Sequence, residues 1–367
     1  MLRVVDAYGS PYERGFRYGR AAGDLIKRNA SFFLSLWSRT LGLSREAALS
    51  KALEFAEAVN SLYPDLYEEM RGMADGASIS LSLVAAVNSR YEFMRLSLFG
   101  GGCTSLTILP EASVDQHIIA GQNWDYHPGV AGSTVILRLR TRRLDILSHV
   151  EAGALARTGL NSSGLGLAVN ALASGLDRFG RAVPFLVLCR LILESKNMDD
   201  VVEEVSSLRT RYPGRYSYNF LVASASGDAA SLEVHPRGIN VVRPIKGVLV
   251  HTNHFLGDTG FEDLVPRTYP DTLIRYRRVW ELLSGEAIGV NDVKTVFRDH
   301  YNFPRSICRH LDPGASIEHQ SVTIASIIMD LNRRLILVTK GQPCINDYRP
   351  FSINGSRATQ TPSARDA

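Results

Sequence analysis

The feature that most constrains the fold of this chain is a change of hydrophobic period at a run of three glycines. Before residue 93 the apolar residues recur at the spacing of amphipathic helices, whereas after residue 103 they form short runs rich in β-branched residues, as strands do. The glycines at positions 100–102 interrupt both patterns. We therefore expect a helical N-terminal segment, residues 1–102, followed by a strand-rich part, residues 103–351.

Helix-boundary signals are frequent in the first hundred residues, which we expect to be helical throughout. Ser44 is a good N-cap for a helix over residues 45–60, and Pro64 can occupy the first turn of the next helix. That helix is expected to end at Gly76, and a further helix is predicted over residues 81–93.

The remainder of the chain mixes short strands with helices. The five strands expected first would form an antiparallel meander: 104–109, 118–122, 134–140, 145–151 and 165–171. Later come helices at 184–194, 198–208, 269–283 and 290–300, strands at 219–224, 231–234 and 247–252, and a hairpin of 321–330 with 334–340. This order predicts an α+β fold whose sheets pack together under helices, in one integrated domain. Residues 352–367 are polar and are expected to form a flexible tail.

Charge and hydropathy exclude some classes of partner. The chain has 41 basic and 37 acidic residues, a balance that does not indicate a nucleic-acid-binding surface. Its densest basic run, residues 275–278, fits a solvated helix face. No uncharged apolar run reaches the roughly 18 residues of a membrane span, and the N-terminus lacks the apolar core of a signal peptide. We expect a cytoplasmic protein with no nucleic-acid or membrane partner.

The candidate metal ligands form no recognisable motif. The four cysteines lie at wide and unpatterned spacing: Cys103, Cys189, Cys308 and Cys344. His251 and His254 lie three residues apart without a neighbouring carboxylate or cysteine, which makes a weak ligand set. We predict no metal site and no cofactor.

Cys103, directly after the glycines, is the candidate nucleophile. A cysteine thiol with an ordinary pKa of about 8.5 needs a base at neutral pH. If the Gly102–Cys103 bond breaks, the new α-amino group, with a pKa of roughly 7.7–8.0, can act as that base. Glycine suits this cleavage because its carbonyl carbon is open to the attacking sulfur. The alternative is that Cys103 is only a small buried hydrophobic residue at the start of a strand.

Several motifs occur in the order seen in one family. The motifs are Gly102-Cys103-Thr104, Gly121-Gln122-Asn123-Trp124-Asp125, Asn161-Ser162-Ser163-Gly164 with Asn170-Ala171-Leu172, His251-Thr252-Asn253-His254, and residues 303–309. Together with N-terminal motifs they resemble the acyl-coenzyme A:6-aminopenicillanic acid acyltransferase family over residues 8–345. The resemblance implies an N-terminal-nucleophile (Ntn) hydrolase fold, a four-layer αββα sandwich, made as a precursor that cuts itself between Gly102 and Cys103.

The resemblance also implies roles for individual residues. Cys103 would form a thioester with the acyl group, and Asp125 would orient the new amine. Asn253 would donate a hydrogen bond to the oxyanion, and Asn170 would bind substrate or amine. The alternative for Asp125 is a surface or turn aspartate, and the alternative for Asn170 is a turn or strand-end asparagine that holds the backbone.

Substrate contacts are expected from residues beside these positions: Gln122, Tyr126, Ser306 and Arg309. Ser306 and Arg309 would either face the pocket or brace a loop. Related bile-salt-hydrolase-like enzymes have an arginine where this chain has Gln122, so we do not expect a fixed positive charge beside the thiol.

The sequence thus predicts a self-processing enzyme that takes an acyl group from a small acyl-amide or acyl-thioester, acyl-coenzyme A among them, and passes it to water or an amine. Its other partner would be its own cleaved N-terminal segment. The alternatives are an amidohydrolase without transferase activity and a non-processed, non-catalytic binding protein.

Overall fold

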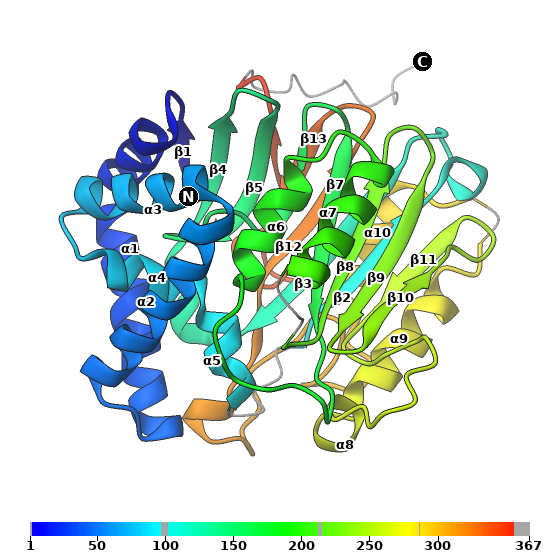
Figure 1. The fold of residues 1–367 in the computed structure, drawn as a ribbon. Helices are drawn as coiled ribbons and strands as arrows, with labels where there is room; N and C mark the ends of the chain where they lie inside the picture. The colour runs from blue at the N-terminus through cyan, green and yellow to red at the C-terminus, as the bar shows by residue number, and fades with distance from the viewer. Residues whose placement is uncertain (1, 97–101, 212–214, 286, 356–367) are drawn as a thin grey trace.

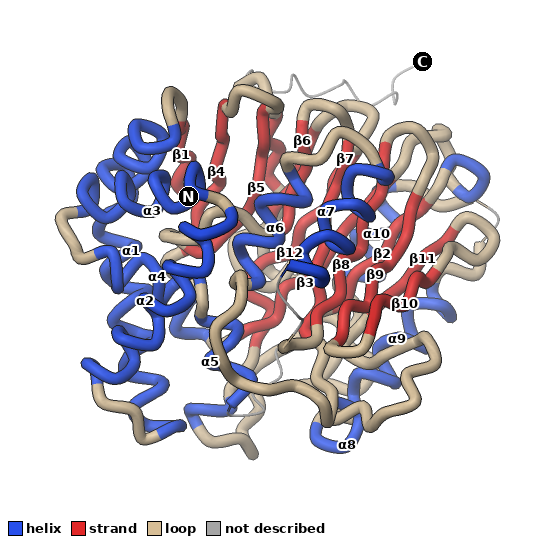
Figure 2. Tube along the Cα trace, viewed as in Figure 1, coloured by secondary structure: helices blue, strands red, loops and turns tan. Residues whose placement is uncertain are grey.

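Two stacked β-sheets lie between two layers of helices in the computed structural model (Figures 1 and 2). The structure describes residues 2–96, 102–211, 215–285 and 287–355. The helices before residue 97 and those between residues 185 and 211 cover one sheet, and the helices between residues 265 and 297 cover the other (Figure 1). The four-layer α+β arrangement expected from the sequence is therefore confirmed.

The first outer layer contains seven helices: α1 (Pro11–Leu41), α2 (Arg45–Leu62), α3 (Pro64–Ala77), α4 (Leu81–Asn88), α5 (Arg90–Leu96), α6 (Phe185–Leu193) and α7 (Met198–Arg211). As predicted, Ser44 caps α2 by accepting a hydrogen bond from the Ala47 N–H, and Pro64 is the first residue of α3. The helix predicted over residues 81–93 is interrupted at Ser89 and becomes α4 and α5.

Gly76 does not end its helix, contrary to the prediction. Helix α3 continues to Ala77 and is terminated by Ser78 in the left-handed conformation, with φ of 52°. A Cβ atom on Gly76 would lie 2.2 Å from the Phe16 carbonyl oxygen of α1, and one on Gly72 would lie 2.0 Å from the Tyr12 carbonyl oxygen. These glycines therefore permit close packing of α1 against α3.

The first sheet has eight strands in the order β1 (Arg3–Ala7), β4 (Thr134–Arg140), β5 (Asp145–Glu151), β6 (Thr158–Asn161), β7 (Leu165–Ala171), β8 (Tyr218–Ser224), β9 (Ala229–His235) and β10 (Gly238–Val242). The second has six, in the order β11 (Val248–His251), β2 (Thr104–Ile108), β3 (Ile119–Tyr126), β12 (Val322–Asp330), β13 (Leu335–Val338) and β14 (Arg349–Ser352). The outer helices on this side are α8 (Val265–Thr268), α9 (Asp271–Leu282) and α10 (Val290–Phe297).

The expected continuous meander is wrong, because the chain changes sheets between β3 and β4. Strands β2 and β3 belong to the six-stranded sheet, whereas β4 to β7 form an antiparallel run in the other. Alternation of side chains identifies a strand and its two faces but not the sheet that it joins. The sequence analysis also missed β1, β6, β10 and β14, which have four or five residues each.

Three hydrophobic clusters fill the three spaces between the four layers. One contains Phe33 of α1 and Val169 of β7, and a second, between the sheets, contains Ala168 of β7 and Ile327 of β12. The third lies between the six-stranded sheet and α10, around Phe297. Val169 and Ala168 therefore face opposite sides of one strand, as the two-residue period requires.

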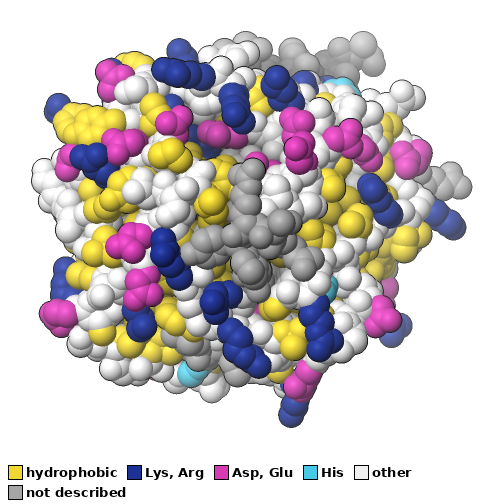
Figure 3. Space-filling model, in the orientation of Figure 1, with side chains coloured by type: hydrophobic (Ala, Val, Ile, Leu, Met, Phe, Trp, Pro, Cys, Tyr) yellow, Lys and Arg dark blue, Asp and Glu magenta, His cyan; other side chains and the backbone are white. Residues whose placement is uncertain are grey.

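The expected tail begins later than residue 352. Ser352 is the last residue of β14, and Ile353 is buried between the sheets, while residues 356–367 lie outside the described part of the chain. Among the described residues, no helix has the length and apolar character needed to cross a membrane. Basic and acidic side chains both occur across the face shown in Figure 3.

Candidate active site

Cys103 lies just before β2, is buried, and borders a small cavity between the helical layer and the sheets. The cavity volume is about 20 Å³, which is room for a water-sized molecule. Its lining comes mainly from α5, β3 and β7: Arg90, Tyr91, Met94, Cys103, Trp124, Asp125, Tyr126, Arg157, Val169, Ala171 and Phe185. The cavity thus joins residues that lie far apart in the sequence.

The backbone of Cys103 is held on both sides by side chains. Its N–H donates to Oδ1 of Asn253 at 2.9 Å, and its carbonyl oxygen accepts a hydrogen bond of 2.6 Å from Arg275. The same guanidinium donates to Oδ1 of Asn253 at 3.0 Å and is paired with Asp271 on the preceding turn of α9. Arg275 therefore fixes both the cysteine and the asparagine that contacts it.

The sulfur of Cys103 has separate partners. The backbone N–H of Asp125 donates to Sγ, and Nη2 of Arg157 lies 3.8 Å from it. Burial raises the pKa of the Cys103 thiol, and the Arg157 charge opposes that shift. The Arg157 guanidinium also stacks over the Trp124 ring, 3.9 Å from its centroid. The expectation that no fixed positive charge lies beside the thiol is therefore wrong.

Asp125 is fully buried at the end of β3, next to the sulfur. Burial raises the pKa of its carboxyl to about 7, although Arg309 and Arg275 favour the charged form. Its two oxygens accept hydrogen bonds from Arg309 Nε at 3.3 Å and from Thr323 Oγ1 at 2.6 Å. Asp125 is thus not a surface or turn residue.

Arg309 connects Asp125 to the residue before the cysteine. Its guanidinium pairs with both Asp125 and Asp271. A Cβ atom built on Gly102 would lie 2.5 Å from Nη2 of this arginine. Because two carboxylates hold the guanidinium in place, only glycine fits at position 102 without displacing it.

The chain matches one known protein family over most of its length. The sequence model described as acyl-coenzyme A:6-aminopenicillanic acid acyl-transferase matches residues 113–344, more than half of the chain. The chain belongs to this family. It is also 28% identical over 347 residues to the 40 kDa form of acyl-coenzyme A:6-aminopenicillanic-acid-acyltransferase from Emericella nidulans, an alignment that covers 94% of this chain and 93% of the relative. The prediction of an acyltransferase or amidohydrolase enzyme is confirmed at this level.

Two solved structures are also similar to this acyltransferase-family chain. Penicillin V acylase from Agrobacterium tumefaciens has a TM-score of 0.47 at 11% identity, with 70% of this chain and 88% of that chain covered. A mutant of conjugated bile acid hydrolase from Clostridium perfringens has a TM-score of 0.44 at 15% identity, with 69% and 93% covered.

Two of the predicted site residues of this acyltransferase-family chain point away from the cavity. Asn170 lies between Val169 and Ala171 on β7, so its side chain faces the space between the sheets, where Oδ1 accepts hydrogen bonds from Ser105 and Asn219. Gln122 also lies between the sheets, where it bonds to the Val169 backbone and accepts a 2.5 Å hydrogen bond from Thr158. Neither side chain contacts the sulfur.

Of the other predicted positions, some lie at the cavity or at Cys103 and one does not. Tyr126 lines the cavity, with the Arg90 guanidinium 4.6 Å from its ring centroid. Ser306 donates to the Cys308 carbonyl oxygen at 2.5 Å and therefore braces a loop. Asn253 contacts Cys103, but through its oxygen, while its Nδ2 donates to the Ala171 carbonyl oxygen at 3.1 Å.

Sequence reasoning missed Arg157, Arg275, Asp271 and Thr323. Arg275 is only 1% exposed, so its assignment to a solvated helix face is wrong. The signal was available: Arg275 lies three residues after Thr272 and four before Val279, on the buried face of α9. Arg157 lies in a loop before β6, and nothing in its local sequence indicates the sulfur contact.

His251 does have a carboxylate neighbour, contrary to the sequence analysis. Its Nε2 lies 2.9 Å from Oε1 of Glu233, and its Nδ1 lies 2.8 Å from the Thr252 carbonyl oxygen. Both ring nitrogens therefore face oxygen atoms at hydrogen-bond distance, and neither is open to a metal ion.

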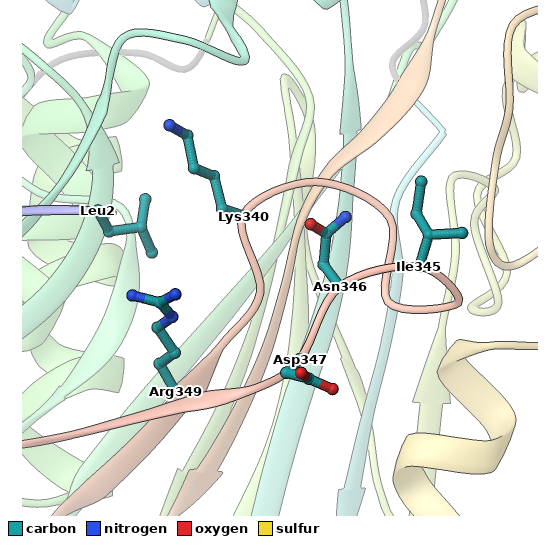
Figure 4. Close-up of a pocket in the computed structure, with 6 residues that line it drawn as sticks. All are labelled: Leu2, Lys340, Ile345, Asn346, Asp347 and Arg349. Atoms are coloured by element: carbon teal, nitrogen blue, oxygen red, sulfur yellow. The ribbon is translucent and has the colours of Figure 1, made fainter.

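A larger cavity lies at the other end of the six-stranded sheet. It has a volume of about 260 Å³ and is lined by Leu2, by four residues of the loop from β13 to β14 and by the first residue of β14. Figure 4 shows these side chains: Leu2, Lys340, Ile345, Asn346, Asp347 and Arg349. None of its lining residues also lines the Cys103 cavity.

Proposed function

We propose that this protein is a self-processing cysteine Ntn enzyme, in which cleavage before Cys103 creates a thiol nucleophile and its own amine base. The proposal rests on one observation: the nitrogen and the sulfur of Cys103 are held by different polar groups. The nitrogen of Cys103 is held by Asn253, and the sulfur by the Asp125 N–H and Arg157. Any buried residue needs a partner for its backbone N–H, but a cysteine that only filled space would not need polar partners for its sulfur.

Self-cleavage would begin with attack of the sulfur on the Gly102 carbonyl carbon. The bond from that carbon to the Cys103 nitrogen breaks, the thiol proton passes to the nitrogen, and a thioester links Gly102 to the sulfur. Water then hydrolyses the thioester, which leaves a carboxylate on Gly102 and a free amine and thiol on Cys103. The Arg309 guanidinium packs against Gly102, so it is our candidate to stabilise the oxyanion in this step.

In the mature enzyme the free amine would take the thiol proton, and the thiolate would attack the substrate carbonyl. The Arg157 charge favours the thiolate, and Asn253 Oδ1 can continue to accept a hydrogen bond from the amine. The Asp125 carboxylate would stabilise the protonated amine through each cycle. For Asn253 to donate to the oxyanion as well, its Nδ2 would have to leave the Ala171 carbonyl oxygen.

Cleavage would also provide access for the substrate. The cavity beside Cys103 has room for a water-sized molecule but not for an acyl chain, and residues of α5 line it. Helix α5 directly precedes the segment that ends at Gly102. We propose that cleavage before Cys103 allows α5 to move away from the sulfur and thereby opens the cavity, so that the uncleaved chain neither binds nor acylates substrate.

The proposed substrates are small acyl-amides or acyl-thioesters, including acyl-coenzyme A, the donor in the name of the Emericella relative. The acceptor would be an amine or water. The alternative is hydrolysis alone, which is tested by incubating the mature enzyme with an acyl-amide, with and without a competing amine. Formation of acylated amine supports transfer, and hydrolysis alone in the presence of the amine excludes it.

The processing step is tested on a denaturing gel. Cleavage before Cys103 divides the 367-residue chain into pieces of 102 and 265 residues. The Cys103→Ala variant should remain one chain, and this variant also provides the uncleaved form for substrate-binding measurements. A full-length wild-type protein that shows no acyl transfer or hydrolysis would favour the non-catalytic alternative.

A further inference from the structure

Four metal-ligating side chains converge at a loop on the outer side of the six-stranded sheet. His300 lies three residues after α10, Cys308 and His310 lie in the following loop, and Cys344 lies in the loop between β13 and β14. Their ligand atoms all lie within 4.8 Å of one another. We call these four residues the loop cluster; none of them lines the Cys103 cavity.

The separations within the loop cluster match a tetrahedral metal site. Nε2 of His310 lies 3.0 Å from Nε2 of His300, 3.7 Å from Sγ of Cys308 and 3.5 Å from Sγ of Cys344. Zinc bonds of about 2.3 Å to sulfur and 2.0–2.1 Å to nitrogen place tetrahedral ligand pairs about 3.6 Å apart for sulfur and nitrogen and about 3.3 Å apart for two nitrogens. The three separations that involve His310 are therefore already close to the expected values, and the other ligand pairs lie within 4.8 Å.

Hydrogen bonding cannot account for this convergence. Nε2 of His310 faces three polar atoms, yet a ring nitrogen carries either one hydrogen or one lone pair. A cation at the centre would interact with all four atoms at once.

We propose that the loop cluster binds one Zn²⁺ ion through His300, Cys308, His310 and Cys344. Two thiolates and two neutral imidazoles give a closed ligand set with no position for substrate, which is typical of a structural zinc site. Binding would release the two thiol protons, and the site as a whole would be neutral. The prediction from sequence that the chain has no metal site would then be wrong. The ligands form no local motif, because three lie in one stretch of the chain and the fourth, Cys344, follows His310 by 34 residues.

The position of the loop cluster indicates that a bound ion would stabilise the segment that carries Arg309. Cys308 and His310 flank Arg309, whose side chain points the other way and pairs with Asp125 and Asp271. The backbone of this segment is tied to β12 by the bond from the Arg309 N–H to Thr323 Oγ1 at 2.8 Å. A zinc ion would join this segment to the β13–β14 loop shown in Figure 4 and so restrict the movement of Arg309.

The first test is the metal content of the full-length protein, purified without chelators or a polyhistidine tag and dialysed against zinc and then against metal-free buffer. Elemental analysis should find about one zinc per chain, as one four-ligand site requires. Cys344→Ser should reduce the zinc content to background, whereas Cys189→Ala, which changes a buried cysteine on α6, should retain it. Wild-type protein without bound zinc, or Cys344→Ser protein with the same content, would overturn the proposal.

Two further measurements cover a variant that fails to fold. Replacement of zinc by Co²⁺ in the wild-type protein should give the visible bands of a tetrahedral ion and a thiolate charge-transfer band. The exposed His300 can be changed to alanine with little effect on the core, and zinc affinity should fall at least 10–100-fold, the approximate cost of losing even an outer-shell partner. An octahedral cobalt spectrum, or a Cys308–Cys344 disulfide in freshly purified protein, would contradict the assignment. Cys103→Ala should keep its zinc, so a failure of this proposal is distinguishable from a failure of self-processing.

Discussion

The Cys103 site and the loop cluster are two groups of reactive side chains that share one loop but balance their charges differently. Around Cys103, buried arginines and carboxylates are paired in fixed positions: Arg309 with Asp125 and Asp271, and Arg275 with Asp271. In the loop cluster the residues are histidines and cysteines, which carry lone pairs rather than opposite charges. The first arrangement suits chemistry in which charge develops and disappears, and the second suits a resident cation.

The two sites differ in burial, and burial determines whether a charged group needs a fixed partner. The ion pairs near Cys103 are almost fully buried, so each charged group needs its partner to offset the cost of desolvation. In the loop cluster only Cys308 is buried, and the other three ligands are partly or fully exposed, so they can be solvated without an ion. We therefore expect changes at the first site to abolish or slow chemistry and changes at the second to alter metal content and stability.

The largest effect is expected from removal of the nucleophile. Cys103→Ala should abolish both chain cleavage and acyl transfer, because no other described cysteine lines the cavity. A denaturing gel and an acyl-transfer assay measure this result. Zinc content should not change, and cleavage that persists in this variant would separate processing from Cys103.

A smaller but still large effect is expected at Arg157. Arg157→Met removes the positive charge 3.8 Å from the sulfur, so the pKa of the Cys103 thiol should rise and less thiolate should form at a given pH. Each unit of increase lowers the thiolate fraction about tenfold below the pKa. The rate of iodoacetamide labelling of Cys103 over a pH series measures the shift, with Arg157→Lys as the variant that keeps the charge. Equal rates in wild type and Arg157→Met would exclude electrostatic support of the thiolate.

A pH shift of about one unit or less is expected at Thr323, because its hydroxyl stabilises the charged form of Asp125 by a single hydrogen bond. The pKa of Asp125 is about 7, so the carboxylate fraction, and with it activity, should rise with pH through this region. Thr323→Val removes a donor to the carboxylate, which raises that pKa further and moves the acidic limb of the pH–rate profile to higher pH. Thr323→Ser keeps the donor and should leave the limb in place. A limb that does not move in Thr323→Val would show that Asp125 does not control it.

The smallest effect on chemistry is expected from removal of zinc. A ligand present at about 100 times its dissociation constant stabilises a fold by about 2.7 kcal/mol, so chelation should lower Tm by several degrees. Differential scanning calorimetry with and without chelator measures this change. The Cys344→Ser variant is the control, because its Tm should not respond to chelator; a response equal to that of wild type would place the metal elsewhere.

The sequence predicted the layers of the fold well but not the assignment of strands to sheets. Hydrophobic period identifies the helices of residues 11–96 and most longer strands, because burial of one face imposes that period. The short strand β1 was missed, since it pairs in parallel with β4 more than a hundred residues later. Pairing of that kind depends on the tertiary fold and leaves little local signal.

The sequence predicted only part of the candidate site. Cys103, Asp125 and Asn253 were predicted from motifs, and the structure brings them together, while their roles remain predictions. Arg157 and Arg275 were missed because their importance depends on where a loop and a helix face meet the cysteine. Asn170 and Gln122 were placed at the cavity from their motifs, although the two-residue period turns both side chains between the sheets.

Self-processing is tested most directly by the N-terminal sequence and intact mass of the wild-type protein after purification at neutral pH. We expect two chains, of which the larger has 265 residues and begins at Cys103 with a free amine. A single uncleaved chain that nevertheless transfers acyl groups at full rate would contradict this expectation, because the proposed base would then never have formed.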